Sequence, residues 1–412
     1  MNELQKIVDA YALVRSRGAR AALATVVGVE GSAYRRPGAR AIFTEDGETV
    51  GAISGGCLER DVAERAERVI ESRDTMMIEY DTRGDEDIVW GLGLGCNGVV
   101  RVLLESLHEG GDGARALEFV GELLRARKYG VMATVVARDV NQSGGATQNM
   151  KVGARLLLDE KLNVCGGAIA DAAPALAARI GADAVDALAC RRALTCSYET
   201  NSGRVEIFYD VVAPPRPLVV FGAGHDALPL VRQAHTLGWH VTVVDTRARA
   251  LTKERFTEAD EVVLCRAEDV DGRVSLTENT AAVVMTHNYL DDVELLKTLL
   301  PSPVCYLGVL GPRARTSKLL AEIGACAAAE PARARLHSPI GLDIGAETPE
   351  EIALSIVAEV GAVCAARGGG FLRDRAAPIH GESEAGSTAT PVANALRVRF
   401  GAGESALACR SS

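Results

Sequence analysis

A short glycine-rich turn between a buried strand and a helix constrains the fold of this chain more than any other feature. The apolar run 218–221 leads into the sequence GAGHDA at 222–227, and a helical pattern follows as far as Leu237. A strand, the pattern G-x-G-x-x-A and a helix, in that order, are typical of a dinucleotide-binding βαβ unit. Because such a unit needs helices on both faces of its strands, the turn predicts a parallel sheet.

Each position of this turn has a physical role in binding a phosphate. Gly222 forms the tight turn and Gly224 lets the backbone approach a ligand, while the N-terminus of the following helix favours an anion. Asp245 ends the next predicted strand, where its carboxylate could accept a hydrogen bond from a ribose hydroxyl. We therefore expect these three residues to contact a nucleotide or another phosphate-bearing ligand. A domain that keeps the turn for packing alone is the alternative.

The remainder of the segment 218–375 alternates apolar strands with amphipathic helices, which predicts a Rossmann-like, doubly wound parallel sheet. His225 lies on the first turn, and His287 and Arg313 each follow a later apolar strand. Ligands bind at the carboxyl ends of the strands in such sheets. We therefore expect these three side chains and Asp245 around one pocket, with Arg313 paired to a phosphate or carboxylate.

The first 212 residues contain an internal duplication. Three landmarks recur in the same order, namely ATVV at 24–27 and 133–136, GAR at 38–40 and 153–155, and GG at 55–56 and 166–167. This shared order predicts a pseudo-symmetric α/β domain over residues 1–212. The proline-rich segment 213–217 is expected to be a linker. Residues 376–412, rich in Gly, Ser and Ala, are expected to be a disordered tail.

Two cysteines of the first domain lie in glycine-rich segments. Cys57 follows Gly55 and Gly56 just before a predicted helix, a position that lowers a thiol pKa and offers backbone N–H groups to an anion. Cys96 lies in the sequence GLGLGCNG at 91–98. Two thiols in such loops suit sulfur or soft-metal chemistry. Small buried residues beside tight turns are the alternative interpretation.

Composition excludes several other classes of protein. Arg36 lies in a basic, glycine-bounded segment suited to a phosphate, but the whole chain carries a formal charge of −10, which argues against nucleic-acid binding. Every stretch without a charged residue is shorter than the roughly 20 residues of a membrane helix, and the amphipathic start differs from a secretory signal. We therefore expect a cytoplasmic protein that binds neither membrane nor nucleic acid. Its 10 cysteines lack paired Cys-x-x-Cys motifs, so we expect reduced thiols and no metal site.

Taken together, these motifs resemble the XdhC/CoxI family of xanthine dehydrogenase accessory proteins. The resemblance covers nearly the whole chain to about Arg375. The segments that carry it are 24–27, 31–40, 54–59, 93–98, 221–226, 286–287, 308–313, 339–346 and 358–359. Two positions depart from the family pattern, because Asn97 stands where glycine is usual and Asp226 where a small apolar residue is usual.

The resemblance implies a molybdenum-cofactor carrier rather than a turnover enzyme, without catalytic residues of its own. Such a protein holds the pterin dithiolene (molybdopterin), helps it to receive a terminal sulfur from a cysteine desulfurase, and delivers it to a molybdenum hydroxylase such as xanthine dehydrogenase. We also expect a homodimer. The alternative is an NAD(P)-dependent oxidoreductase that uses Asp245 for the ribose and His225 or His287 as acid or base. A third interpretation is an interaction scaffold whose ligand turn is vestigial.

The acidic residue in the glycine turn bears on the choice between these functions. The carboxylate of Asp226 beside the expected phosphate position would repel a pyrophosphate, which weakens the case for NAD. A capping role for Asp226 at the start of the helix is the alternative.

Overall fold

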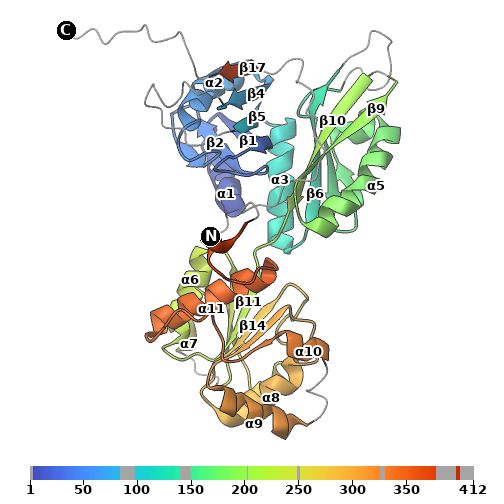
Figure 1. Ribbon diagram of the computed structural model, residues 1–412. Coiled ribbons are helices and arrows are strands. Elements are labelled where there is room, and N and C mark those ends of the chain that lie inside the picture. Colours follow the sequence, from blue (N-terminus) through green and yellow to red (C-terminus); the bar gives the residue numbers. More distant parts are fainter. Residues whose placement is uncertain are drawn as a thin grey trace, which may run out of the picture. The chain divides into compact units, whose positions relative to one another are not determined.

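The computed structural model describes residues 3–83, 98–139, 150–201, 203–247, 251–324, 330–376 and 396–399. The chain divides into two compact units (Figure 1). The first unit comprises residues 3–214 and the strand 396–399, and the second begins at Pro215, within the segment expected to be a linker. None of the helices in these ranges is long and apolar enough to cross a membrane.

The first unit contains two sheets that repeat one topology. The first half consists of α1 (Glu3–Ser16), β1 (Ala21–Gly31), β2 (Arg40–Thr44), β3 (Thr49–Gly51), α2 (Glu59–Ser72), β4 (Thr75–Asp81) and β5 (Gly98–Ser106). The second half consists of α3 (Asp112–Ala126), β6 (Gly130–Arg138), β7 (Arg155–Asp159), β8 (Val164–Gly166), α4 (Ala168–Ala172), α5 (Pro174–Cys190), β9 (Leu194–Thr200) and β10 (Gly203–Val212). Their strand orders, β4-β5-β1-β2-β3 and β9-β10-β6-β7-β8, confirm the predicted duplication.

The two halves share a core because each sheet buries both faces. Helix α2 covers one face of the first sheet with an apolar stripe at helical spacing, and α5 covers the equivalent face of the second sheet. The opposite faces supply a joint cluster that includes Val27 and Leu103 from the first half and Val136 and Phe208 from the second. The strands β1, β5 and β6 therefore have near-continuous apolar sequences, since no face of them meets water along most of their length.

Three buried ion pairs connect the halves, namely Arg40–Asp210, Arg155–Glu105 and Arg101–Glu206. Arg40 and Arg155 occupy the two copies of the GAR landmark, and each donates to the carbonyl of the glycine two residues earlier at 3.0 Å. Each arginine thus pairs with a carboxylate of the opposite half. Arg40, which ends the basic segment of the first half, is consequently part of the core and is not free to bind a phosphate.

The tail contains a strand that the sequence did not indicate. Residues Leu396–Arg399 form β17, which pairs in parallel with β4 at the edge of the first sheet. The expectation of disorder over 376–412 therefore fails for these four residues.

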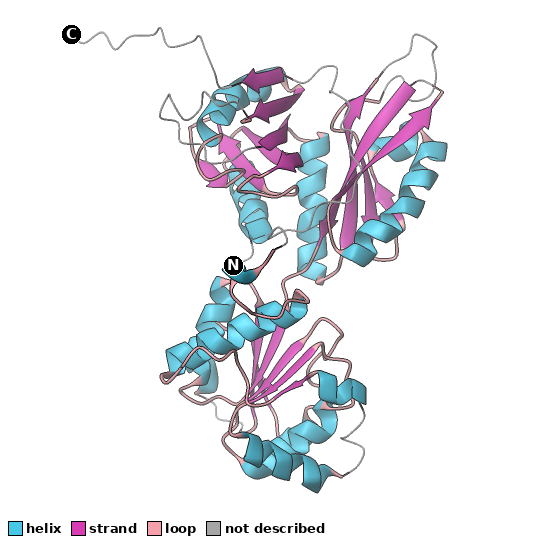
Figure 2. Ribbon diagram, in the orientation of Figure 1, coloured by secondary structure: helices cyan, strands magenta, loops and turns pink. Residues whose placement is uncertain are grey.

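The second unit is a parallel sheet with helices on both faces, as predicted (Figure 2). Its strands are β11 (Pro217–Phe221), β12 (His240–Asp245), β13 (Glu261–Leu264), β14 (Ala281–Val284), β15 (Tyr306–Val309) and β16 (Leu336–His337). Its helices are α6 (Ala227–Thr236), α7 (Thr252–Arg255), α8 (Tyr289–Leu299), α9 (Arg313–Ile323), α10 (Glu330–Ala334) and α11 (Pro349–Cys364). Helices α6 and α11 cover one face, and α8 and α9 cover the other.

The strand order of this sheet, β13-β12-β11-β14-β15-β16, fixes where a ligand can bind. From β11 the chain adds β12 and β13 on one side of the sheet, and it then adds β14, β15 and β16 on the other side. The loops after β11 and β14 therefore diverge to opposite faces and leave a crevice between them. This is the order of dinucleotide-binding Rossmann folds. The glycine turn at 222–227 follows β11 and therefore lies at this switch point.

Candidate functional site

The glycine turn packs tightly against the end of β14. Gly222 has φ of 125°, and a Cβ added there would lie 2.3 Å from the carbonyl oxygen of Met285. A Cβ on Gly224 would lie 2.3 Å from Oδ1 of Asp226. Glycine is thus required at 222 by backbone conformation and close approach to the backbone, whereas a side chain at 224 would force the Asp226 carboxylate to move.

A carboxylate and an imidazole meet at the switch point. Nε2 of His287 lies 2.6 Å from Oδ2 of Asp226, and His287 itself has the left-handed φ of 57°. The His287 side chain is 59% exposed and that of Asp226 is 23% exposed, so solvent or a ligand can reach both. Asp226 occupies the N-cap position of α6, but the alternative of a side-chain cap is not realised, because its carboxylate makes no cap hydrogen bond and contacts His287 instead.

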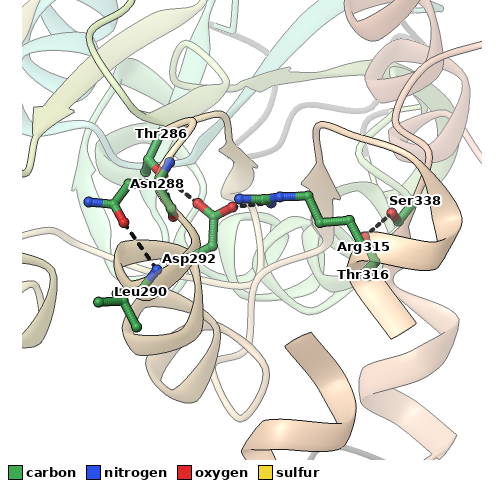
Figure 3. A network of polar contacts seen from close by, with 7 residues as sticks. All are labelled: Thr286, Asn288, Leu290, Asp292, Arg315, Thr316 and Ser338. Carbon is green, nitrogen blue, oxygen red and sulfur yellow. Dashed lines mark hydrogen bonds and ion pairs between the residues drawn. The ribbon is translucent and has the colours of Figure 1, made fainter. Parts of the chain in front are cut away.

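A buried polar network holds the backbone around His287 (Figure 3). Asp292 of α8 accepts hydrogen bonds from Thr286, at the end of β14, and from Arg315, which reaches across from α9. Asn288 caps α8 by accepting from the backbone N–H of Leu290 at 3.1 Å. The network joins two neighbouring strand-to-helix loops on the carboxyl edge of the sheet and leaves little freedom to His287, which lies between two of its members.

The other basic residues predicted for this site are exposed at the same edge. His225 lies on the glycine turn, next to Asp226. Arg313 is the first residue of α9, one strand further along the sheet. Arg315, two positions on, is the arginine held by the fold, through Asp292 and a stacking contact with Tyr289. The structure therefore brings together His225, Asp226 and His287, and leaves the Arg313 side chain at the solvent-exposed start of the neighbouring helix.

Asp245 is already engaged within the fold. Its side chain is 3% exposed, and its two oxygens accept from Thr252 Oγ1 at 2.5 Å and from the backbone N–H of Arg247 at 3.0 Å. These contacts fasten the start of α7 to the end of β12. A ribose hydroxyl would have to displace Thr252 to reach this carboxylate.

The carboxylate of Glu59, the first residue of α2, binds backbone N–H groups of the loop before this helix. Glu59 accepts the backbone N–H groups of Ile53 at 3.1 Å and Ser54 at 2.8 Å, while Ser54 Oγ accepts those of Gly56 and Leu58 at 3.1 Å each. Burial opposes the charge on Glu59, yet the hydrogen bonds from Ser54 and the backbone hold the pKa of the carboxyl below its usual value. These four backbone N–H groups therefore already have acceptors within the chain. The sequence had predicted that N–H groups of this loop would be open to an external anion.

The exposed surface of this loop combines a thiol, a ring and a guanidinium. Gly55, Gly56 and Cys57 are exposed, and so is Arg36 on the preceding loop. The ring of Tyr34 lies against Gly55, since a Cβ added to that glycine would be 3.5–3.6 Å from three ring atoms, and the Tyr34 side chain is 73% exposed. Tyr34 is a site residue that the sequence motifs did not indicate, although it lies only two positions before Arg36 and carries an aromatic ring that can stack on a ligand.

Cys96 lies outside the described residues. Among the residues that are described, no cluster of three or more His, Cys, Asp or Glu side chains could hold a metal ion.

Comparison with known proteins connects both units to one family. The family model described as the XdhC Rossmann domain matches residues 218–360, and the model of the XdhC and CoxI family matches residues 14–81. A Bacillus subtilis protein described as a probable xanthine dehydrogenase subunit is 32% identical over 340 residues, which cover 82% of this chain and 92% of that protein. The chain belongs to the XdhC/CoxI family.

One solved structure and one further relative are also similar to this chain. A crystal structure described as a xanthine dehydrogenase from Bacillus halodurans has a TM-score of 0.69 and 29% identity, over 89% of this chain and 97% of that one. The uncharacterized protein YqeB of Escherichia coli is 33% identical over 161 residues, or 38% of this chain and 29% of that protein. The resemblance seen in the sequence is thereby confirmed.

Proposed function

We propose that this XdhC/CoxI protein is an accessory factor in the maturation of a xanthine dehydrogenase-type molybdenum hydroxylase. It would bind the molybdenum cofactor as cargo, support its sulfuration by a cysteine desulfurase, and deliver it to the acceptor enzyme. The observation that carries the proposal is the match over both units to a relative described as a xanthine dehydrogenase subunit, of which 92% is covered. The protein then acts by binding and release rather than by turnover.

The chemistry of the cargo fits the groups at the switch point. Its phosphate needs hydrogen-bond donors and positive charge, and its pterin needs a flat surface or an edge with polar partners. Gly224 permits close approach to the N-terminus of α6, and His225, His287 and Arg313 supply donors around it. Asp226 contacts His287 at 2.6 Å and so fixes the position of this imidazole beside the glycine turn.

The first unit offers a separate set of groups for the same cargo. The exposed thiol of Cys57 suits a step that handles sulfur, and the Tyr34 ring and Arg36 suit a planar ring and a phosphate. We propose that these residues contact the cofactor during sulfuration. The backbone N–H groups behind them donate to Glu59 and to Ser54 instead.

NAD(P) binding is the second candidate, and the strand order of the sheet together with the glycine turn favours it. One contact weighs against it. The Asp245 carboxylate, which would bind the ribose, is buried and already accepts a hydrogen bond from Thr252. An oxidoreductase would therefore need this carboxylate to become accessible on binding.

The experiment that tests the proposal is co-expression of the full chain with an intact cofactor pathway, followed by purification. Bound cofactor is released, oxidised and measured by pterin fluorescence, together with molybdenum content, while NAD and NADP are titrated in parallel. We expect about one pterin per chain and no measurable nucleotide affinity. Tight NAD(P) binding by protein that carries no pterin would overturn the proposal in favour of an oxidoreductase.

A further inference from the structure

Two cysteines lie together at the edge of the parallel sheet opposite the candidate site. Cys305 immediately precedes β15, and Cys364 is the last residue of α11. The fold brings these residues, which are 59 positions apart in sequence, to a distance of 3.7 Å between their sulfur atoms. Both side chains are half-buried, so each remains within reach of a small molecule. Neither residue belongs to a motif that the proposed function uses.

The geometry of the pair suits disulfide formation. A separation of 3.7 Å is close to sulfur–sulfur van der Waals contact, and a disulfide of about 2.05 Å requires only a modest further approach. The Cys305 thiol donates to the carbonyl of Thr280 at 3.3 Å. Contact with Cys364 and burial raise the pKa of Cys305, whereas the guanidinium of Arg216 favours its thiolate form. Exchange at this pair should therefore be faster at alkaline pH, because the thiolate is the attacking species.

We propose that Cys305 and Cys364 form a redox-active dithiol that closes into an intramolecular disulfide by exchange with a low-molecular-weight disulfide. One thiol loses its proton and attacks a sulfur of the small disulfide, which releases one small thiol and leaves a mixed disulfide on the protein. The second protein thiol then loses its proton, attacks the mixed disulfide and displaces the other small thiol. Two protein thiols are oxidised and one small disulfide is reduced to two thiols, so atoms and electrons balance.

The disulfide would act on the helix that supports the glycine turn. Ile356 and Val360 of α11 share a buried cluster with Leu230 and Ala234 of α6, the helix that begins at this turn. Oxidation fastens the C-terminal end of α11 to the start of β15 and thereby restrains the support of α6.

The test uses the full chain in buffers of reduced and oxidised glutathione at increasing oxidising ratio. Samples are acid-quenched, alkylated and digested without reduction. We expect a peptide that links Cys305 to Cys364, the loss of two reactive thiols, and a mass lower by about 2 Da. Cys305→Ser and Cys364→Ser should each abolish this species. Cys265→Ser, a buried cysteine of the same unit, should retain it.

The outcome that overturns the proposal is the absence of the 305–364 link at the most oxidising ratio, while glutathione adds to the exposed Cys57 and so shows that the oxidant is active. If either serine variant fails to fold, the wild-type protein still decides the question with phenylarsine oxide, which bridges two adjacent thiols. Bound arsenic at one per chain on these two cysteines supports the dithiol, and its absence from them contradicts it. Neither readout depends on cofactor binding.

Discussion

Replacement of Arg155 by methionine tests how far the two halves of the first unit depend on one buried pair. Arg155 donates to both oxygens of Glu105, with one contact of 2.7 Å, and the side chains are 5% and 3% exposed. Burial disfavours the charged guanidinium, but Glu105 raises the pKa of Arg155 above its usual value. Removal of one partner from such a pair leaves an uncompensated buried charge, which costs about 3–5 kcal/mol. We expect Arg155→Met to destabilise the first unit by this amount.

The measurement is hydrogen exchange of peptides from β6 and β7, because the chain has two units and need not unfold in one step. The expected destabilisation lowers protection of the slowest amides by roughly 10²- to 4 × 10³-fold. The double variant Arg155→Met with Glu105→Leu should recover most of it, since an apolar pair of similar size removes both charges. A single variant that costs less than about 1 kcal/mol, or a double variant at least as unstable as the single, would refute the reasoning.

Three further predictions concern the candidate sites. Gly222→Ala should destabilise the second unit by about 1–3 kcal/mol in urea unfolding, whereas Gly272→Ala, where an added Cβ meets nothing within 4 Å, should cost less. Because the pKa of Glu59 is lowered in the folded protein, its contribution is complete above the unfolded pKa of about 4.3 and is lost as pH falls through the folded value. The stability difference between wild type and Glu59→Gln should therefore vanish in acid, and a difference that grows there would contradict the assignment. Arg313→Gln should weaken cofactor retention about tenfold, judged by pterin content after dialysis, while Arg266→Gln, at a 77% exposed side chain, should leave it unchanged.

The parts of the fold that the sequence predicts are those encoded by local pattern. The strand 218–221 and the glycine turn specify a βαβ unit within one short stretch, and the repeated ATVV and GAR strings specify two similar halves. The strand β17 escaped prediction because four residues in a Gly- and Ser-rich tail give no periodicity of their own. Its pairing depends on the edge that β4 offers.

The contacts that the sequence did not reveal involve partners distant in sequence. Arg40 has the local context of a basic loop, but its partner Asp210 lies 170 positions away. Asp226 has the context of a helix cap, but His287 lies 61 positions away and takes its carboxylate. Glu59 is the local exception, since its contact with Ser54 spans only five positions, but this spacing differs from the three-residue spacing of a capping box and so gave no recognisable signal.

Transfer of cofactor to an acceptor tests the central claim most directly. Full-length protein purified with its pterin is mixed with a cofactor-free xanthine dehydrogenase-type enzyme, the two are separated, and pterin fluorescence is measured in each fraction. We predict that pterin leaves this chain and appears in the acceptor together with xanthine-oxidising activity. Protein that carries no pterin after co-expression, or that keeps all of it while the acceptor stays inactive, would contradict the account.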